Sequence, residues 1–91
     1  MAYYVLEYRY GDMETRARVR PRHLDYVSGL NADGKVVLAG PVGDGGGAMV
    51  VYRAADEAEA RRLVDEDPYT LEGVTVDASL REWNVVIPAQ S

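Results

Sequence analysis

The sequence contains a single histidine, His23, which is the residue best suited to acid–base chemistry near neutral pH. On a helix it shares one row with Val27 and Leu30, four and seven residues later, so its imidazole is expected to point toward the edge of a sheet. Two interpretations are open at this point. His23 is either a structural histidine bonded to the backbone, or a general acid or base.

Asp67 is the candidate partner of this histidine. It continues the apolar helix face of Ala60, Leu63 and Val64, which turns its carboxylate inward at the C-terminal end of that helix. The helix dipole disfavours negative charge at such an end, so a cationic partner is expected, and a protonated imidazole would serve. The alternative is an ordinary turn, because the next residue is a proline.

Residues 40–47 form a glycine-rich connection that permits close approach of a ligand or of another backbone. The segment lacks a Gly-Lys-Ser/Thr ending, and a strand rather than a helix is expected to follow it. Nucleotide binding is therefore not expected. Asp44, within this connection, is either a turn residue or a polar group placed over a pocket.

The composition argues against several other functions. The chain has no cysteine, and its one histidine and scattered carboxylates show no metal-ligand spacing, so neither a metal nor another cofactor is expected. Fifteen acidic and ten basic residues give a net charge of -5, which does not suit nucleic-acid binding. No signal peptide and no apolar run of roughly 20 residues is present, so we expect a cytoplasmic protein that does not bind membranes.

The elements that must position these residues follow a recognisable order. Strands are predicted at residues 3–10, 36–39, 48–52 and within 74–87, with a bulge or bend near Glu82 and Trp83. One helix is predicted to begin at Pro21 and end at Ala32, because proline is well tolerated as a first helical residue. The second is predicted between Asp56, its N-cap, and Pro68.

This β-α-β-β-α-β order predicts one α+β domain over residues 1–91, with a ferredoxin-like, four-stranded antiparallel sheet and two helices on one face. Several strands carry apolar residues on both faces, and no further element is available to cover the second face. A homodimer is therefore expected. Tyr3, Tyr4, Tyr8 and Tyr10 are interpreted as core and dimer packing, with pocket lining as the alternative.

Several short motifs occur in a fixed order along nearly the whole chain. They are Arg20-Pro21-Arg22-His23-Leu24, Leu38-Ala39-Gly40-Pro41 with Asp44, Asp67-Pro68-Tyr69, Gly73-Val74 and a late Trp83. In order and spacing they resemble the YCII-related (YciI-like) family. The resemblance implies a dimeric α+β barrel, in which two ferredoxin-like sheets pack face to face. It also implies a pocket near the histidine and the Asp-Pro aspartate.

By this resemblance, His23 and Asp67 become the candidate catalytic acid–base pair. The candidate substrate-binding residues are Arg20, Gly40, Pro41, Asp44, Tyr69 and Trp83. Relatives of the family include a dehydrochlorinase acting on a chlorinated hydroxyquinol, and muconolactone isomerase shares the general barrel. The resemblance thus favours cofactor-independent elimination or isomerisation of a small metabolite. The alternatives are a non-catalytic small-molecule-binding or accessory protein, and a structural dimer without a ligand.

Overall fold

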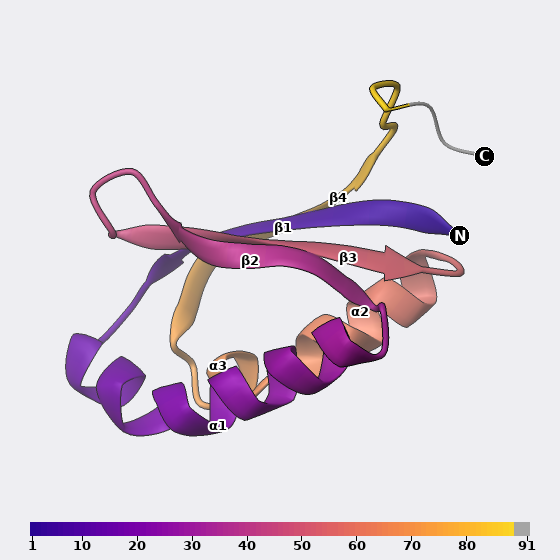
Figure 1. The fold of residues 1–91 in the computed structure, drawn as a ribbon. Coiled ribbons are helices and arrows are strands. Elements are labelled where there is room, and N and C mark those ends of the chain that lie inside the picture. The colour runs from indigo at the N-terminus through magenta and orange to yellow at the C-terminus, as the bar shows by residue number, and fades with distance from the viewer. Residues whose placement is uncertain (89–91) are drawn as a thin grey trace.

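The computed structural model describes residues 1–88, which form a four-stranded antiparallel sheet with helices on one of its faces (Figure 1). The elements are β1 (Ala2–Tyr10), α1 (Met13–Ala32), β2 (Val36–Val42), β3 (Gly47–Ala54), α2 (Glu57–Asp65), α3 (Pro68–Leu71) and β4 (Thr75–Trp83). The strands lie in the order β2-β3-β1-β4. The predicted ferredoxin-like α+β arrangement is confirmed, with α3 as an additional short helix.

Helix α1 begins at Met13, so the predicted start at Pro21 was wrong. The side chain of Asp12 caps the helix by accepting hydrogen bonds from the backbone N–H of Thr15 at 3.0 Å and from its hydroxyl at 2.7 Å. The residues that follow are mostly strong helix formers. Pro21 lies inside the helix, where it removes one intrahelical hydrogen bond. The longer helix places two further turns of side chains under the sheet.

The buried face of α1 consists of Val19, His23 and Val27. Leu24 has 41% of its surface exposed. The row that ends at Val27 runs back through His23 to Val19 at steps of four residues and does not include Leu24. A histidine therefore occupies a position that the helix otherwise fills with valine.

The core lies between the sheet and the helices. Tyr26 of α1 donates its hydroxyl to the carbonyl of Leu63 in α2 at 2.7 Å, which ties the two helices together. Burial of each aliphatic core side chain contributes about 1.5–3 kcal/mol. The core residues on the sheet are Tyr4, Leu6, Tyr8, Val36, Ala48, Val50, Tyr52 and Ala54, and those on the helices include Val19, Val27, Ala60, Leu63 and Val64.

The connection between β2 and β3 is shorter than predicted, because β2 continues to Val42 and leaves only residues 43–46 as the turn. Gly47 then starts β3 directly against β1. A side chain at this position would collide with the backbone carbonyl of Tyr8. The glycine is thus required for close approach of two strands, and one of them carries a tyrosine that faces the helices.

A bulge or bend in the last strand was predicted near Glu82 and Trp83, and this position was wrong. The register between β1 and β4 shifts between Glu7 and Arg9, opposite the segment that contains Asp77. Asp77 has a φ of 51°, in the left-handed region that a non-glycine residue rarely adopts. The bulge therefore lies at the start of β4 rather than at its end.

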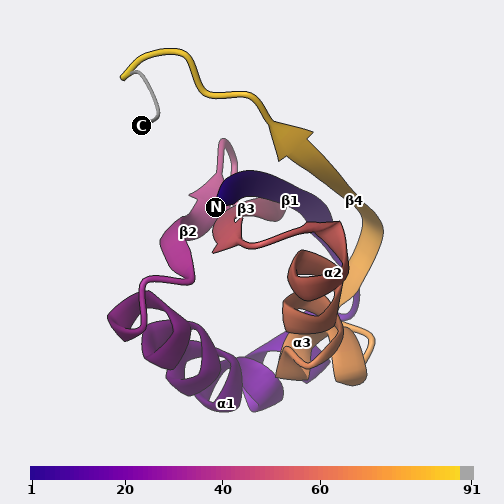
Figure 2. The ribbon, with the colours of Figure 1, turned by 90° about the vertical axis from the view of Figure 1, so that its right-hand side faces the viewer.

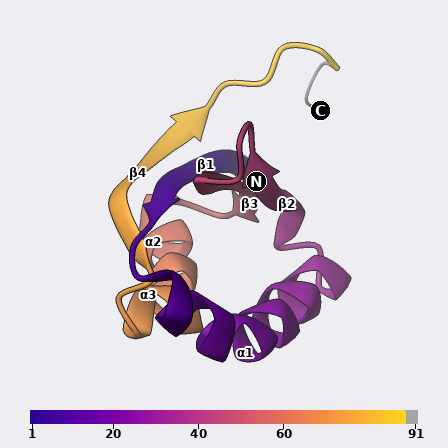
Figure 3. The same ribbon diagram turned by 90° about the vertical axis from the view of Figure 1, so that its left-hand side faces the viewer.

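The face of the sheet away from the helices, here called the outer face, is partly apolar. Leu38 and Trp83 have 66% and 47% of their surface exposed there, and Glu7 pairs with Arg81 at 2.6 Å. Figures 2 and 3 show the helices on one side only, with the segment after β4 extending on the opposite side. The outer face comprises Tyr3, Val5, Glu7, Leu38, Met49, Val51, Arg53, Arg81 and Trp83.

Candidate functional site

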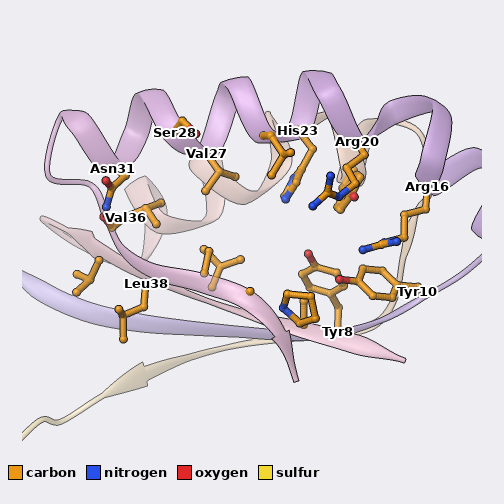
Figure 4. A pocket seen from close by; sticks show the side chains of 18 residues that line it. Tyr8, Tyr10, Arg16, Arg20, His23, Val27, Ser28, Asn31, Val36 and Leu38 are labelled. Atoms are coloured by element: carbon orange, nitrogen blue, oxygen red, sulfur yellow. Dashed lines mark hydrogen bonds between the residues drawn. The ribbon is translucent and has the colours of Figure 1, made fainter. Parts of the chain in front are cut away.

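A cavity of about 430 Å³, here called the central cavity, lies between α1 and the sheet (Figure 4). This volume is within the range typical of small-molecule sites. The imidazole of His23 points from the helix into the cavity, and the ring of Tyr8 faces it from the sheet. The main lining residues are Arg16, Arg20, His23, Leu24, Val27, Ser28 and Asn31 from α1, Tyr8 and Tyr10 from β1, residues 36–41 from β2, Ala48 and Val50 from β3, and Tyr69 from α3.

His23 is hydrogen-bonded to Asp67 across the core. The imidazole Nδ1 lies 2.8 Å from one carboxylate oxygen and 3.1 Å from the other. Both side chains are buried, with 8% of His23 and 3% of Asp67 exposed. The two residues that were singled out in the sequence are therefore in contact, and Asp67 lies behind His23 rather than in the cavity wall.

Asp67 was predicted to lie at the C-terminal end of a helix, and this prediction was wrong. Helix α2 ends at Asp65, and Asp67 is the N-cap of α3, where its Oδ1 accepts a hydrogen bond from the backbone N–H of Tyr69 at 2.8 Å. The following Pro68 is the first residue of α3, a position that has no need of a backbone N–H. This tight turn points the carboxylate inward at His23 and holds it there.

Tyr69 restricts the orientation of the imidazole plane of His23. Its ring stacks on the imidazole of His23 with centroids 3.7 Å apart and planes within 4° of each other. Tyr10 packs edge-on against Tyr69, with ring centroids 6.3 Å apart. The imidazole is thus held in its plane by the carboxylate and across its plane by an aromatic ring, which leaves it little rotational freedom.

The phenols around this pair are held in their neutral form. Burial raises the pKa of Tyr8 well above its usual value, and the Tyr10, Asp67 and Tyr69 side chains raise it further. Burial also raises the pKa of Tyr52, and the Asp67 carboxylate adds to that effect. The polar groups that surround the buried carboxylate are therefore hydroxyls rather than phenolates at neutral pH.

Four of the candidate substrate-binding residues line the central cavity, namely Arg20, Gly40, Pro41 and Tyr69. Two do not. Asp44 accepts a hydrogen bond from the backbone N–H of Gly46 at 2.8 Å, as a turn residue would, and lines a different hollow beside Glu7 and Met49. Trp83 lies on the outer face next to Tyr3. Within one chain, neither residue reaches His23.

Arg16, Tyr8 and Tyr10 are among the cavity residues that were not assigned to the site from the sequence. For the two tyrosines, pocket lining was only the alternative to core packing. Arg16 was missed because the helix was predicted to begin after it. The spacing would have assigned Arg16 to the site, because Arg16, Arg20 and His23 follow each other at steps of four and three residues on one helix face.

The residues described by the structure show neither a metal site nor a membrane-spanning helix. Among residues 1–88, no group of three or more histidine, cysteine, aspartate and glutamate side chains is placed to hold a metal ion. Within the same residues, no helix is both long and apolar enough to cross a membrane.

Several solved structures are similar in fold, and three of them are described here. The first is 5-chloro-2-hydroxyhydroquinone dehydrochlorinase from Burkholderia phenoliruptrix in complex with 2,5-dihydroxybenzoquinone, with a TM-score of 0.81 and 21% identity over 97% of this chain and 99% of that one. An antibiotic biosynthesis monooxygenase follows, with a TM-score of 0.59 and 11% identity over 93% and 98%. Protein Atu4242 from Agrobacterium tumefaciens has a TM-score of 0.52 and 16% identity over 92% of both chains.

Among curated proteins, none matches the sequence. The structural similarities are below 25% identity, so they establish the fold and not the reaction. The family model of the YCII-related domain, in contrast, matches residues 1–84, which is nearly the entire chain. This protein therefore belongs to the YCII-related domain family.

Proposed function

We propose that this chain is a cofactor-independent enzyme that moves a proton on a small metabolite bound in the central cavity. In this proposal His23 is the general acid or base, and Asp67 is the residue that positions it. One observation carries the proposal: the only histidine of the chain lines the cavity while its Nδ1 lies 2.8 Å from a buried carboxylate.

The hydrogen bond dictates which imidazole nitrogen is reactive. An ionised carboxylate only accepts hydrogen bonds, so in the neutral imidazole the hydrogen resides on Nδ1 and the lone pair on Nε2. Both contacts between the Asp67 carboxylate and the imidazole are to Nδ1. Nε2 is therefore the nitrogen available to a bound molecule, and the imidazolium that forms when it accepts a proton lies beside a negative charge that stabilises it.

The proposed reaction class is elimination or isomerisation. In an elimination, Nε2 removes a proton from the substrate and the released electron pair forms a double bond. The leaving group then departs with the electron pair of the bond that broke. In an isomerisation, His23 returns the proton to another carbon. A positioned general base typically accelerates such steps by about 10²–10⁴-fold. The family and the similar fold of a dehydrochlorinase support this class.

Arg20, Gly40, Pro41 and Tyr69 are proposed to bind the substrate, since they line the same cavity as His23. Asp44 and Trp83 were also candidates for this role. In the proposed enzyme they would reach a substrate only if a second chain brought them to it.

We further propose a homodimer in which two outer faces pack together. Leu38 and Trp83 supply exposed apolar surface, and a second copy of the chain is a self-complementary partner for such a face. Val37 and Leu38 line both the central cavity and a hollow of about 370 Å³ on the outer face. A partner seated on the outer face would therefore close against the rim of the central cavity.

The test is a turnover assay with 5-chloro-2-hydroxyhydroquinone, the substrate of the similar dehydrochlorinase, together with a panel of small unsaturated acids and lactones. Chloride release and loss of carbon-bound proton signals in D₂O would report elimination and proton exchange. We expect at least one compound to react, and His23→Gln to lower the rate about 100-fold or more. Arg22→Gln, an exposed change on the same helix, should leave the rate unchanged.

Two other outcomes would overturn the proposal. A metabolite that binds with equal affinity to the native chain and to His23→Gln, but is never converted, would favour a non-catalytic small-molecule-binding or accessory protein. If no metabolite shifts the melting temperature, the cavity is a structural feature of a dimer without a ligand.

A further inference from the structure

The central cavity has a charge that is opposite to that of the whole molecule. The chain carries a net charge of -5, yet Arg16 and Arg20 line the cavity and no aspartate or glutamate does. Figure 4 shows both guanidinium groups on the cavity side of α1, near His23. A cavity with two fixed positive charges and no negative one favours an anion.

These arginines are not committed to internal ion pairs. Among residues 1–88, the arginines in ion pairs with carboxylates are Arg62 and Arg81, and neither cavity arginine makes one. The Nε of Arg16 is buried and has no hydrogen-bond partner within the same residues. The protein itself therefore leaves this guanidinium without its full set of hydrogen bonds.

Arg16 is also held in place. Its guanidinium carbon lies 4.2 Å from the centroid of the Tyr10 ring, at a distance typical of a cation–π contact. A planar, oriented guanidinium matches the two oxygens of a carboxylate better than a spherical anion. The site therefore presents a fixed fork of donors rather than a diffuse positive surface.

Part of the remaining cavity wall is aliphatic. Val27 of α1 faces Val36, Pro41 and Val50 of the sheet, so the body of a ligand would be held by aliphatic side chains on two sides. Arg16 and His23 are seven residues apart on one helix face, which corresponds to about 10 Å along the axis.

We propose that the central cavity selects small, flat carboxylates, with the carboxylate on Arg16 and Arg20 and the carbon skeleton between Val27 and the sheet. This assignment deepens the proposed function, because it places the carbon that loses or gains a proton beside Nε2 of His23. Binding of an unreactive acid is measured without turnover, so the substrate class is tested separately from catalysis.

The experiment is calorimetric titration of the native chain with two matched pairs of ligands, benzoate against benzamide and crotonate against crotonamide. Each pair differs mainly in charge. We expect the carboxylates to bind at least tenfold more tightly than the amides. Arg16→Gln and Arg20→Gln should each weaken carboxylate binding by about tenfold, while Arg18→Gln and Arg22→Gln should not, since these exposed residues of α1 do not line the cavity.

Three results would overturn the assignment: neither carboxylate binds at millimolar concentration, the amides bind equally well, or the control variants lose as much affinity as the cavity variants. His23→Gln separates the two proposals. It should leave benzoate affinity within about threefold while it removes proton transfer. Turnover of neutral substrates without any preference for acids would leave the catalytic proposal intact and contradict this one.

Discussion

The imidazole of His23 and the ring of Tyr69 lie face to face, with centroids 3.7 Å apart and planes 4° apart. The same short helix that supplies Tyr69 is capped by Asp67, which bonds the edge of the imidazole. The two residues that flank Pro68 therefore control both the plane and the hydrogen bonding of the histidine. This dependence leads to the first prediction.

Replacing Tyr69 by leucine should release the imidazole, because the side chain that covers its face would be gone. We expect turnover to fall at least tenfold, since small misplacements of a catalytic group cost up to about 100-fold. Stability should fall by about 1–3 kcal/mol because the new side chain fills the buried site poorly. Tyr69→Phe keeps the stacked ring and is the control. Equal rates for Tyr69→Leu and Tyr69→Phe would show that stacking does not position His23.

Alkaline pH should destabilise the fold through its buried phenols. Burial, together with the nearby Glu66 and Asp67 carboxylates, raises the pKa of Tyr26 to about 12, and burial also raises the pKa values of Tyr52 and Tyr69. An unfolded tyrosine ionises near pH 10. Between about pH 10 and 12 the unfolded chain loses phenol protons that the folded chain retains, so the free energy of unfolding decreases as pH rises.

Urea unfolding from about pH 9 to 11.5 measures this decrease. Tyr52→Phe should make the decrease smaller, and it should cost little at neutral pH because the Tyr52 hydroxyl is buried without a hydrogen-bond partner among residues 1–88. A pH slope that is the same in the native chain and in Tyr52→Phe would contradict the assignment.

A charge on the outer face should dissociate the proposed dimer. In Leu38→Glu, a residue with 66% of its surface exposed in the single chain would place a carboxylate in the interface. Sedimentation at micromolar concentration should find dimers for the native chain and monomers of 10.0 kDa for the variant, with unchanged circular dichroism. Leu71→Glu is the matched control, because Leu71 is 68% exposed and lies on α3. A native monomer would refute the proposed dimer.

Gly47→Ala should disturb the cavity through the backbone of Tyr8. The new methyl group would meet the Tyr8 carbonyl, which is fixed in the sheet, so we expect a loss of about 1–3 kcal/mol and weaker ligand binding. In Gly46→Ala the nearest atoms are the ends of the Asp44 and Arg9 side chains, at 3.0 and 3.1 Å, and these can move. Urea unfolding compares the two variants. Equal losses would mean that the close strand approach is not what requires the glycine.

Local patterns were sufficient to predict the order of strands and helices, whereas the pairing of His23 with Asp67 was implied by the resemblance to the family. Periodicity located the strands to within a few residues, and the family motifs named both members of the pair. The prediction failed where one signal masked another. Pro21 was interpreted as a helix start because proline is favoured there. The helix begins eight residues earlier, at Met13, where Asp12 provides the N-cap and bonds Thr15.

The position of Asp67 could not be obtained from helix periodicity, because α2 ends two residues before it and the turn into α3 sets its direction. Trp83 illustrates a different limit. The sequence shows that a tryptophan follows an alternating strand, but only the pairing of β4 with β1 reveals that it shares the outer face with Tyr3. The face that a residue of β4 occupies depends on the register shift that begins at Asp77. The alternation of apolar and polar residues does not predict this shift.

The most direct test of the central claim is the tautomer of His23, measured by ¹⁵N–¹H NMR at a pH where the imidazole is neutral. A chain with one histidine gives one set of imidazole signals. We expect a hydrogen on Nδ1 and a free lone pair on Nε2 in the native chain, with this preference weakened in Asp67→Asn. A native imidazole with its hydrogen on Nε2, unchanged in Asp67→Asn, would show that Asp67 does not prepare His23 to accept a proton in the cavity.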